Sequence, residues 1–438
     1  MNPLADQLNQ TLETTAPHVY DMLSDVGKKL FFPKGILSQS AEAKEKAHTI
    51  NATIGIAKEG GHTMHFDTVM AAINHIRPSQ CLTYAPSFGI PDLRRQWQAD
   101  LYKKNPSLAG KTLSLPVVTC GITHGIATVA DVWINPGDVI VLPEMMWGNY
   151  NMIFGVRKNA RIRHYELFTP AGGFNLAAFE QAVRQEAEEN RKITVVLNFP
   201  QNPSGYTVSE AEADGIVDTL TDIAAAGTYV LAVTDDAYFG LFYEPQSIKE
   251  SIFARLCGAH PGILPIKLDG ATKEHFAWGL RVGFITYGSA ISGDTAPIYE
   301  ALERKTAGCI RGTLSNASHL SQTILLKSMQ NETNVAEKRA KFEILMDRAQ
   351  RVKAISTDPK YADAWEVYPF NSGYFMCIRL KTVNAEALRI HLLDRYGVGL
   401  IALGESNLRV AFSCMEADDV EKLFDTVYQG IQELENNP

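Results

Sequence analysis

Between about residues 51 and 325, short apolar runs alternate with amphipathic stretches of helical periodicity. Apolar runs without an exposed polar face are typical of strands that are buried on both sides, and the stretches between them are typical of crossover helices. The pattern therefore predicts an α/β fold with a mostly parallel sheet that is covered by helices on both faces. The predicted strands lie in LSLPVV, DVIVLP, ITVVLNFP, TYVLAVTDD, GILPIKLDG and RVGFITYG.

The two ends of the chain have different patterns. Residues 1–50 mix helical periodicity with polar breaks, and the charged helical stretch VAEKRAKFEILMDRAQRVKAI precedes several strand-like segments and a last helix. We expect residues 1–50 to form an N-terminal arm or part of a small domain. Residues 51–325 are expected to form the large domain, and residues 326–438 a smaller α+β domain.

The composition narrows the classes of partner. The chain has 438 residues, 45% hydrophobic content and a formal net charge of -8, without a block of Lys and Arg that would bind nucleic acid. Its six cysteines are scattered singly, which favours neither a zinc site nor a disulfide framework and suits the cytoplasm. The start of the chain does not resemble a signal peptide, and no apolar run approaches the roughly 20 residues of a membrane span.

Polar residues of complementary chemistry follow three of the predicted strands. They are residues 201–205 (QNPSG), 235–238 (DDAY) and 270–273 (GATK). Ligands of open α/β sheets bind beyond the carboxyl ends of the strands, so we expect an amide, a carboxylate, a phenol and an amine to meet in one crevice. Taken singly, these segments are also typical of a plain turn, a solvated acid pair and a surface lysine.

This set of groups matches what a pyridoxal phosphate (PLP) cofactor requires. An amine forms the Schiff base, and amide and phenol donors hold the oxyanion of the ring. A carboxylate keeps the ring nitrogen protonated, because a buried pyridinium without a counter-ion loses its proton. The sequence therefore predicts a site for PLP at the strand ends, and no metal ion is expected.

The segment KEHFAWGLRVG, from Lys273 to Gly283, resembles the cofactor motif of fold-type I PLP enzymes, in which an arginine follows the lysine by eight residues. The resemblance extends from about residue 50 to residue 430 and points to the aspartate and aromatic aminotransferase branch. It implies that Lys273 carries the cofactor and that Arg281 binds the phosphate, for which a guanidinium fork is suited in geometry and charge. The family often has a hydroxyl residue where this chain has Gly270, so Thr272 or water is expected to make that contact.

Two more segments match family contacts to the cofactor ring. The Asn-Pro-Ser-Gly sequence at 202–205 resembles the signature that places Asn202 against the 3'-oxygen, which Tyr238 is expected to share. Asp235 resembles the partner of the pyridine nitrogen. Asp236 is the alternative if the register is shifted by one residue.

The phosphate and the ring face have candidate contacts further upstream. Ile122 and Thr123 lie in the glycine-containing turn TCGITHG, where free N–H groups at a helix start attract a phosphate, although a simple strand-to-helix turn is equally typical. Trp147, in MMWGN, resembles the aromatic residue that stacks on the cofactor. The family's aspartate branch has Pro before this Trp, where our chain has Met146.

The resemblance also implies a homodimer and a substrate site. Tyr84 matches a Tyr that reaches the phosphate of the neighbouring subunit, so each active site would be shared between two chains. Arg409, in NLRVAFS, resembles the strand residue that binds the substrate α-carboxylate, and Gly55 and Asn202 are expected to line the same pocket. Arg311 matches the partner-chain Arg that reads a distal carboxylate, and the alternative is an interface or surface cation.

We expect a PLP-dependent aminotransferase that moves an amino group between an amino acid and a 2-oxo acid, with a dicarboxylate as at least one substrate. Arg409 would orient the substrate, and Lys273 would move the proton from Cα. A β-lyase or decarboxylase of the same fold type is the nearest alternative. A non-catalytic PLP-binding regulator is the alternative of another class, but residues 1–50 show no basic helix-turn-helix pattern.

Overall fold

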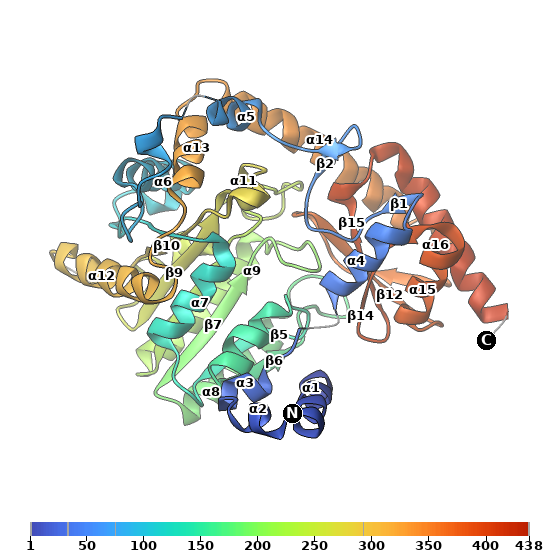
Figure 1. Ribbon diagram of the computed structural model, residues 1–438, viewed down its shortest axis with the longest axis horizontal. Coiled ribbons are helices and arrows are strands. Elements are labelled where there is room, and N and C mark those ends of the chain that lie inside the picture. Colours follow the sequence, from blue (N-terminus) through green and yellow to red (C-terminus); the bar gives the residue numbers. More distant parts are fainter. Residues whose placement is uncertain (1, 33–34, 75, 292, 437–438) are drawn as a thin grey trace.

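The computed structural model describes residues 2–32, 35–74, 76–291 and 293–436, and its largest sheet contains all the apolar runs named above (Figure 1). Within the described residues the strand order is β4-β10-β9-β8-β7-β5-β6, and only β10 runs antiparallel to its neighbours. This confirms the predicted α/β fold. The strands are β4 (Val117–Thr119), β5 (Val139–Pro143), β6 (Arg161–Tyr165), β7 (Lys192–Asn198), β8 (Tyr229–Asp235), β9 (Ile263–Gly270) and β10 (Gly283–Tyr287).

Helices surround this sheet and continue into a second lobe. Before residue 330 they are α1 (Pro3–Thr15), α2 (Pro17–Asp21), α3 (Asp25–Lys29), α4 (Ile36–Lys46), α5 (Asp67–Ile73), α6 (Pro91–Lys104), α7 (Gly121–Trp133), α8 (Leu176–Glu189), α9 (Glu210–Ala225), α10 (Ile252–Leu256), α11 (Ala271–Glu274), α12 (Ala296–Thr313) and α13 (His319–Met329). The later helices are α14 (Asn334–Ser356), α15 (Ala385–Tyr396) and α16 (Val420–Asn436). Short 3-10 turns are η1 (Pro78–Gln80), η2 (Pro106–Leu108), η4 (Trp278–Leu280), η5 (Pro359–Tyr361), η6 (Phe412–Cys414) and η7 (Ala417–Asp419), and η3 (Asn151–Arg157) is a π-helix.

The apolar runs form strands because both faces of the sheet are buried. In β8, Leu231 and Val233 belong to the same hydrophobic cluster as α7, whereas Val230 and Ala232 belong to the cluster that contains α8 and α9. Successive side chains of a strand point to opposite faces, so a continuous apolar run supplies both clusters. The sheet therefore separates two packed layers.

Strand β6 was not predicted from the sequence. Its sequence RIRHY carries charged residues because it lies at the edge of the sheet, where Arg161 is exposed and Tyr165 is buried. Arg161 forms a bidentate pair with Glu186 of α8, at 2.8 and 2.6 Å. A strand that buries only part of its surface lacks the continuous apolar run by which the other strands were found.

The second lobe contains a smaller antiparallel sheet with the order β11-β12-β15-β14. In Figure 1 it lies on the right with α15 and α16, and α14 extends toward it across the top of the molecule. The first part of the chain joins it, because β1 pairs in parallel with β13 and the Gln39 side chain of α4 bonds both backbone groups of Ala402. The strands are β1 (Ile50–Asn51), β11 (Trp365–Val367), β12 (Phe375–Leu380), β13 (Val398–Gly399), β14 (Ile401–Leu403) and β15 (Asn407–Ala411), and a separate hairpin has β2 (Lys58–Glu59) and β3 (His62–Thr63).

The described part of the chain has no helix that is both long enough and apolar enough to cross a membrane. The boundaries at residues 50 and 325 stay predictions.

The Asn-Pro-Ser-Gly turn after β7 contacts the second lobe through Gly205. Its carbonyl oxygen accepts hydrogen bonds from the backbone N–H groups of Asn371 and Ser372, both at 2.9 Å. Gly205 has a φ of +77°, and a Cβ at this position would overlap the carbonyl oxygen of Phe375. Both the backbone conformation and the close approach therefore require glycine.

We predict that Gly205→Ala lowers the free energy of unfolding by roughly 2–5 kcal/mol, from left-handed backbone strain plus steric overlap. Denaturant unfolding of the full chain measures this loss. Gly137→Ala is the matched control, because Gly137 has a φ of +86° and a Cβ added there would have no neighbouring atom within 4 Å. If both variants lost the same free energy of unfolding, the overlap of the added Ala side chain with the second lobe would not contribute to the loss.

Candidate active site

A cavity of about 1480 Å3 lies at the carboxyl ends of β7, β8 and β9 and extends to the second lobe. Parallel strands bring their carboxyl ends to one edge, which is why segments far apart in the sequence meet here. Most of the residues singled out from the sequence line this cavity. They are Gly55, Ile122, Thr123, Trp147, Asn202, Asp235, Tyr238, Thr272, Lys273, Arg281 and Arg409.

Lys273 lies in the short helix α11, directly after β9, and points into the cavity. Its Nζ is 4.7 Å from the centroid of the Tyr238 ring. Burial lowers the pKa of the Lys273 amine to about 8, with Asp235 opposing the shift and Arg281 adding to it. A larger fraction of this amine is therefore neutral near pH 7 than for an ordinary lysine, and a neutral amine can act as a nucleophile or a base.

Asp235 ends β8, and its carboxylate is almost fully buried, with 3% of its surface exposed. The Tyr150 hydroxyl donates to Oδ2 at 2.6 Å, and the Ala237 N–H donates to Oδ1 at 3.1 Å. Burial raises the pKa of Asp235, while the Tyr150 hydrogen bond and the charge of Lys273 lower it. A cation in the cavity would be stabilised by this carboxylate.

Asp236, the alternative considered from the sequence, points away from the cavity. Its Oδ2 accepts from the Ser251 hydroxyl at 2.6 Å and forms an ion pair with Lys267. Consecutive residues at the end of a strand face opposite sides, so only one of the two can face the cavity. The structure has Asp235 in that position.

A candidate anion site lies where α7 begins next to Arg281. The N-cap residue of α7, Cys120, makes no side-chain cap, and Ile122 and Thr123 of the first turn line the cavity. Gly121 allows the Arg281 guanidinium to approach, since a Cβ there would overlap it. Uncapped N–H groups, the positive end of the helix dipole and a guanidinium together fit a phosphate group.

Arg409 of β15 lies at the opposite side of the cavity and is 2% exposed. Its Nη2 donates to the Thr53 carbonyl oxygen at 2.7 Å, and its Nη1 donates to Asn202 Oδ1 at 3.3 Å. The guanidinium lies 4.2 Å from the centroid of the Phe375 ring, and its Nε has no hydrogen-bond partner among the residues that the structure describes. A buried guanidinium without a carboxylate partner fits an anionic ligand.

Two aromatic residues lie together at one side of the cavity. Trp147 lines the cavity, and Tyr150 packs against Trp147. Trp147 is half-buried and packs edge-on against Tyr150, with ring centroids 5.6 Å apart. Tyr150 directly precedes the π-helix η3, whose wide turn carries several further lining residues. Such π-helical turns occur often at functional sites.

Tyr84 and Arg311 are not among the residues that line the cavity. Tyr84 is 90% exposed, and its neighbour Leu82 is 80% exposed. Arg311, in the last turn of α12, is also exposed and donates from Nη1 to Ser315 Oγ at 2.7 Å. The single chain therefore does not bring these two residues to the remaining candidates.

Several residues that hold the site were not predicted from the sequence. Besides Tyr150, Asn198 donates from Nδ2 to the Asp235 carbonyl oxygen at 2.7 Å and accepts from the Asn202 N–H at 2.9 Å. Asn198 could have been found from the sequence, because it is the polar residue that ends the apolar run ITVVLN. The contacts of Thr53 and Phe375 with Arg409 join distant segments, so no local pattern indicates them.

The donor set fits PLP. The cavity contains a primary amine, a buried carboxylate that could pair with a ring nitrogen, and an uncapped helix start beside a guanidinium. Asp235 is buried, which strengthens its interactions, whereas Lys273 is half-buried and Arg281 is exposed in the single chain.

Comparisons with known proteins agree with this chemistry. The model of the family "aminotransferase class I and II" matches residues 47–427. The chain is similar to the probable N-acetyl-LL-diaminopimelate aminotransferase of Bacillus subtilis, with 23% identity over 378 residues and 84% of each chain covered. It is also similar to a probable aspartate/prephenate aminotransferase of Aquifex aeolicus, with 24% identity over 362 residues, 78% of this chain and 82% of the relative.

Among solved structures, the fold matches an aminotransferase from Anaerococcus prevotii with a TM-score of 0.82 and 21% identity, covering 93% of this chain and 98% of that one. At this identity the likeness supports the fold of the whole chain.

We predict that Arg281→Met weakens binding of pyridoxal phosphate to the full-length apoprotein by roughly 10- to 100-fold, because charge-assisted hydrogen bonds to the phosphate are lost. Binding of pyridoxal, which lacks the phosphate, should change little. Titration with each compound, followed by absorbance, separates the two effects. Arg95→Met, at an exposed ion pair of α6, is the control. Equal losses for both compounds would contradict a phosphate role for Arg281.

Proposed function

This chain belongs to the class I and II aminotransferases and is a PLP-dependent transaminase. We propose that Lys273 holds its cofactor and that a dicarboxylate is among its substrates. The observation that carries the cofactor assignment is that the Lys273 amine and the buried Asp235 carboxylate line one cavity. The names of the relatives include aspartate, diaminopimelate and prephenate aminotransferases, so they leave the substrate open.

We assign the cofactor contacts by the position of each side chain in the cavity. Lys273 would be bonded to the cofactor, Asp235 would pair with the ring nitrogen, and Asn202 and Tyr238 would hold the ring oxygen. Arg281 and the start of α7 would bind the phosphate. The remaining proposed contacts are Thr272, Ile122 and Thr123 with the phosphate and Trp147 with the ring face.

When bound, PLP supplies an electron sink that allows the Cα–H bond of an amino acid to break by loss of a proton. Arg409 would bind the substrate α-carboxylate, since its buried guanidinium has no carboxylate partner among the described residues and lines the same cavity as Gly55. The Lys273 amine, with its lowered pKa, would accept the proton from Cα and return it to the product. The Tyr150 hydrogen bond would favour the ionised form of Asp235 against the effect of burial, which raises the pKa of this carboxyl.

The dicarboxylate proposal requires a second subunit. Tyr84 and Arg311 are exposed and outside the cavity of their own chain, and Leu82 adds an apolar side chain to the same exposed segment as Tyr84. A two-fold partner that buried this surface would bring Tyr84 to the phosphate and Arg311 to the substrate side chain. We therefore propose a homodimer with shared active sites.

The transaminase reaction is tested by adding single amino acids to the PLP-loaded protein and following the absorption of the cofactor. The parent should convert to the aminated cofactor with its substrates, and Lys273→Ala should bind PLP noncovalently but not convert. Lys305→Ala, at an exposed position of α12, is the control. Conversion at the parental rate in Lys273→Ala would mean that another group moves the proton.

Tyr150→Phe should lower kcat by roughly 10- to 100-fold, because a hydrogen bond to a charged carboxylate is lost. Its loss should raise the pKa of Asp235 further, so the acidic limb of the kcat profile should move to higher pH. Steady-state kinetics across pH measure both effects. An unchanged acidic limb would show that Tyr150 does not influence the pKa of Asp235.

Arg311→Ala should lower kcat/KM for aspartate, glutamate or 2-oxoglutarate by roughly 30-fold or more, since losing one partner of a desolvated charge pair costs about 2–5 kcal/mol. Neutral substrates should be almost unaffected. Arg304→Ala is the matched control, because Arg304 is exposed on the same helix and pairs with Glu300. Equal losses for dicarboxylic and neutral substrates would exclude a recognition role.

A further inference from the structure

We propose that a network of buried ion pairs, in which Lys267 pairs with Asp236 and Asp269 and Glu274 pairs with Lys104 and Lys338, positions the Asp235 and Lys273 side chains. The proposal rests on the proposed function of these two residues. None of the network residues lines the cavity described above. They are therefore positioning residues rather than catalytic ones.

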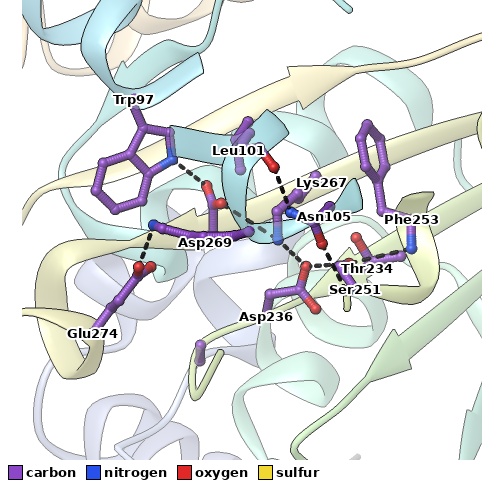
Figure 2. Close-up of polar contacts among 12 residues, drawn as sticks. Trp97, Leu101, Asn105, Thr234, Asp236, Ser251, Phe253, Lys267, Asp269 and Glu274 are labelled. Carbon is purple, nitrogen blue, oxygen red and sulfur yellow. Dashed lines mark hydrogen bonds and ion pairs between the residues drawn. The ribbon is translucent and has the colours of Figure 1, made fainter. Parts of the chain in front are cut away.

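Lys267 is the centre of the network (Figure 2). It is fully buried, forms an ion pair with Asp236, and lies 3.3 Å from Asp269 Oδ2. Both carboxylates are 2% exposed. Burial opposes the charge on Lys267, but Asp236 and Asp269 outweigh it and raise the pKa of the amine, so the cation is retained.

Neutral donors hold the two carboxylates in fixed orientations. Trp97 Nε1 donates to Asp269 Oδ1 at 3.0 Å, and the Ser251 hydroxyl donates to Asp236 Oδ2 at 2.6 Å. The Ser251 N–H in turn donates to Asn105 Oδ1 at 2.8 Å. Each carboxylate is thus bound from two directions, which leaves its strand end little freedom.

Glu274, which immediately follows Lys273, forms the second set of ion pairs. The two sets are joined because Lys104 Nζ lies 4.7 Å from the centroid of the Trp97 ring, whose Nε1 donates to Asp269. Its carboxylate, with 2% of the side chain exposed, pairs with Lys104 of α6 and with Lys338 of α14, the latter at 2.6 Å. The helix that carries Lys273, α11, has only four residues and no side-chain N-cap. A helix this short is not stable by itself, so the Glu274 ion pairs hold it in place.

The network and the active site share consecutive residues of the chain. Asp236 follows Asp235, and Glu274 follows Lys273. In β9, Ile266 and Leu268 pack with the α7 cluster, so Lys267 and Asp269 point to the other face. A displacement of either carboxylate in the network would move a neighbouring side chain in the cavity, because one backbone connects them.

Stability alone does not explain this arrangement. Removing charges from water is costly, and buried ion pairs are often no more stable than apolar side chains of the same volume. Such networks do fix geometry, because each member accepts only a few arrangements of its partners. The charge of Lys267 also opposes the effect of burial on the pKa of Asp235.

The test uses Glu274→Gln in the full chain, which keeps the shape of the side chain and removes its charge. A loosened α11 would admit water to Lys273, whose charged neighbours in the cavity are Asp235 and Arg281, with the Tyr238 ring beside it. Because burial is the main cause of its lowered pKa, the Lys273 pKa should rise from about 8 by roughly one unit or more. Competitive acetylation of the apoprotein across pH, read by peptide mass spectrometry, measures it.

Glu303→Gln is the control, since Glu303 pairs with Arg94 at 2.6 Å, has only 13% of its side chain exposed, and forms no hydrogen bond or ion pair with Asp235 or Lys273 in the described part of the chain. Both variants should lower the Tm, but only Glu274→Gln should shift the Lys273 pKa. In the PLP-loaded enzyme, only Glu274→Gln should lower kcat by roughly 10- to 100-fold with KM little changed. If Glu274→Gln does not fold, Lys338→Met is the milder variant, because Glu274 keeps Lys104.

An unchanged Lys273 pKa in a folded Glu274→Gln or Lys338→Met variant would overturn the proposal. The same holds if kcat falls equally in Glu274→Gln and Glu303→Gln. The acetylation result does not depend on turnover. A parent without transaminase activity would therefore contradict the proposed function, while the Lys273 pKa would still decide the positioning role.

Discussion

Asp235 is a carboxylate enclosed at the end of β8, and its charge has to be balanced by groups from other elements. Tyr150 donates to it from the segment after β5, Lys273 faces it from the segment after β9, and Asn198 fixes its backbone from β7. The cost of burying this charge explains why the surrounding polar residues occur where they do. A cofactor with a protonated ring nitrogen would complete the balance.

The sheet has different polar chemistry on its two sides. The α7 side has the cavity with Lys273 and Asp235, and the other side has Lys267 between two carboxylates. This difference is possible because successive side chains of a strand, such as those of Asp235 and Asp236, point to opposite faces of the sheet. The second lobe contributes Arg409 to the cavity, and α14 contributes Lys338 to the ion pairs of Glu274.

Much of the fold and the candidate site could be predicted from the sequence because both depend on local patterns. Apolar runs identified the central strands, and the eight-residue spacing of Lys273 and Arg281 identified the cavity. The edge strand β6 was missed because its exposed side carries charges. The sequence also left Asp235 and Asp236 as alternatives, because strand register is set by tertiary packing.

Other contacts could not be predicted because they depend on chain segments that meet only in the folded protein. Arg409 is held by Thr53 and lies over Phe375, and neither contact leaves a local pattern. The network around Lys267 was missed for the same reason, since a lysine within the apolar run ILPIKLD gives no sign of two carboxylate partners. The roles of Tyr84 and Arg311 depend on a second subunit, so a single chain does not test them.

The central claim is that the Lys273 amine is the group that bonds the cofactor. Borohydride reduction of the PLP-loaded full-length protein, followed by proteolysis and mass spectrometry, tests it directly. The account predicts that one modified peptide carries the reduced cofactor on Lys273. Modification of a different lysine, or no stable modification in a protein that still binds PLP, would contradict it.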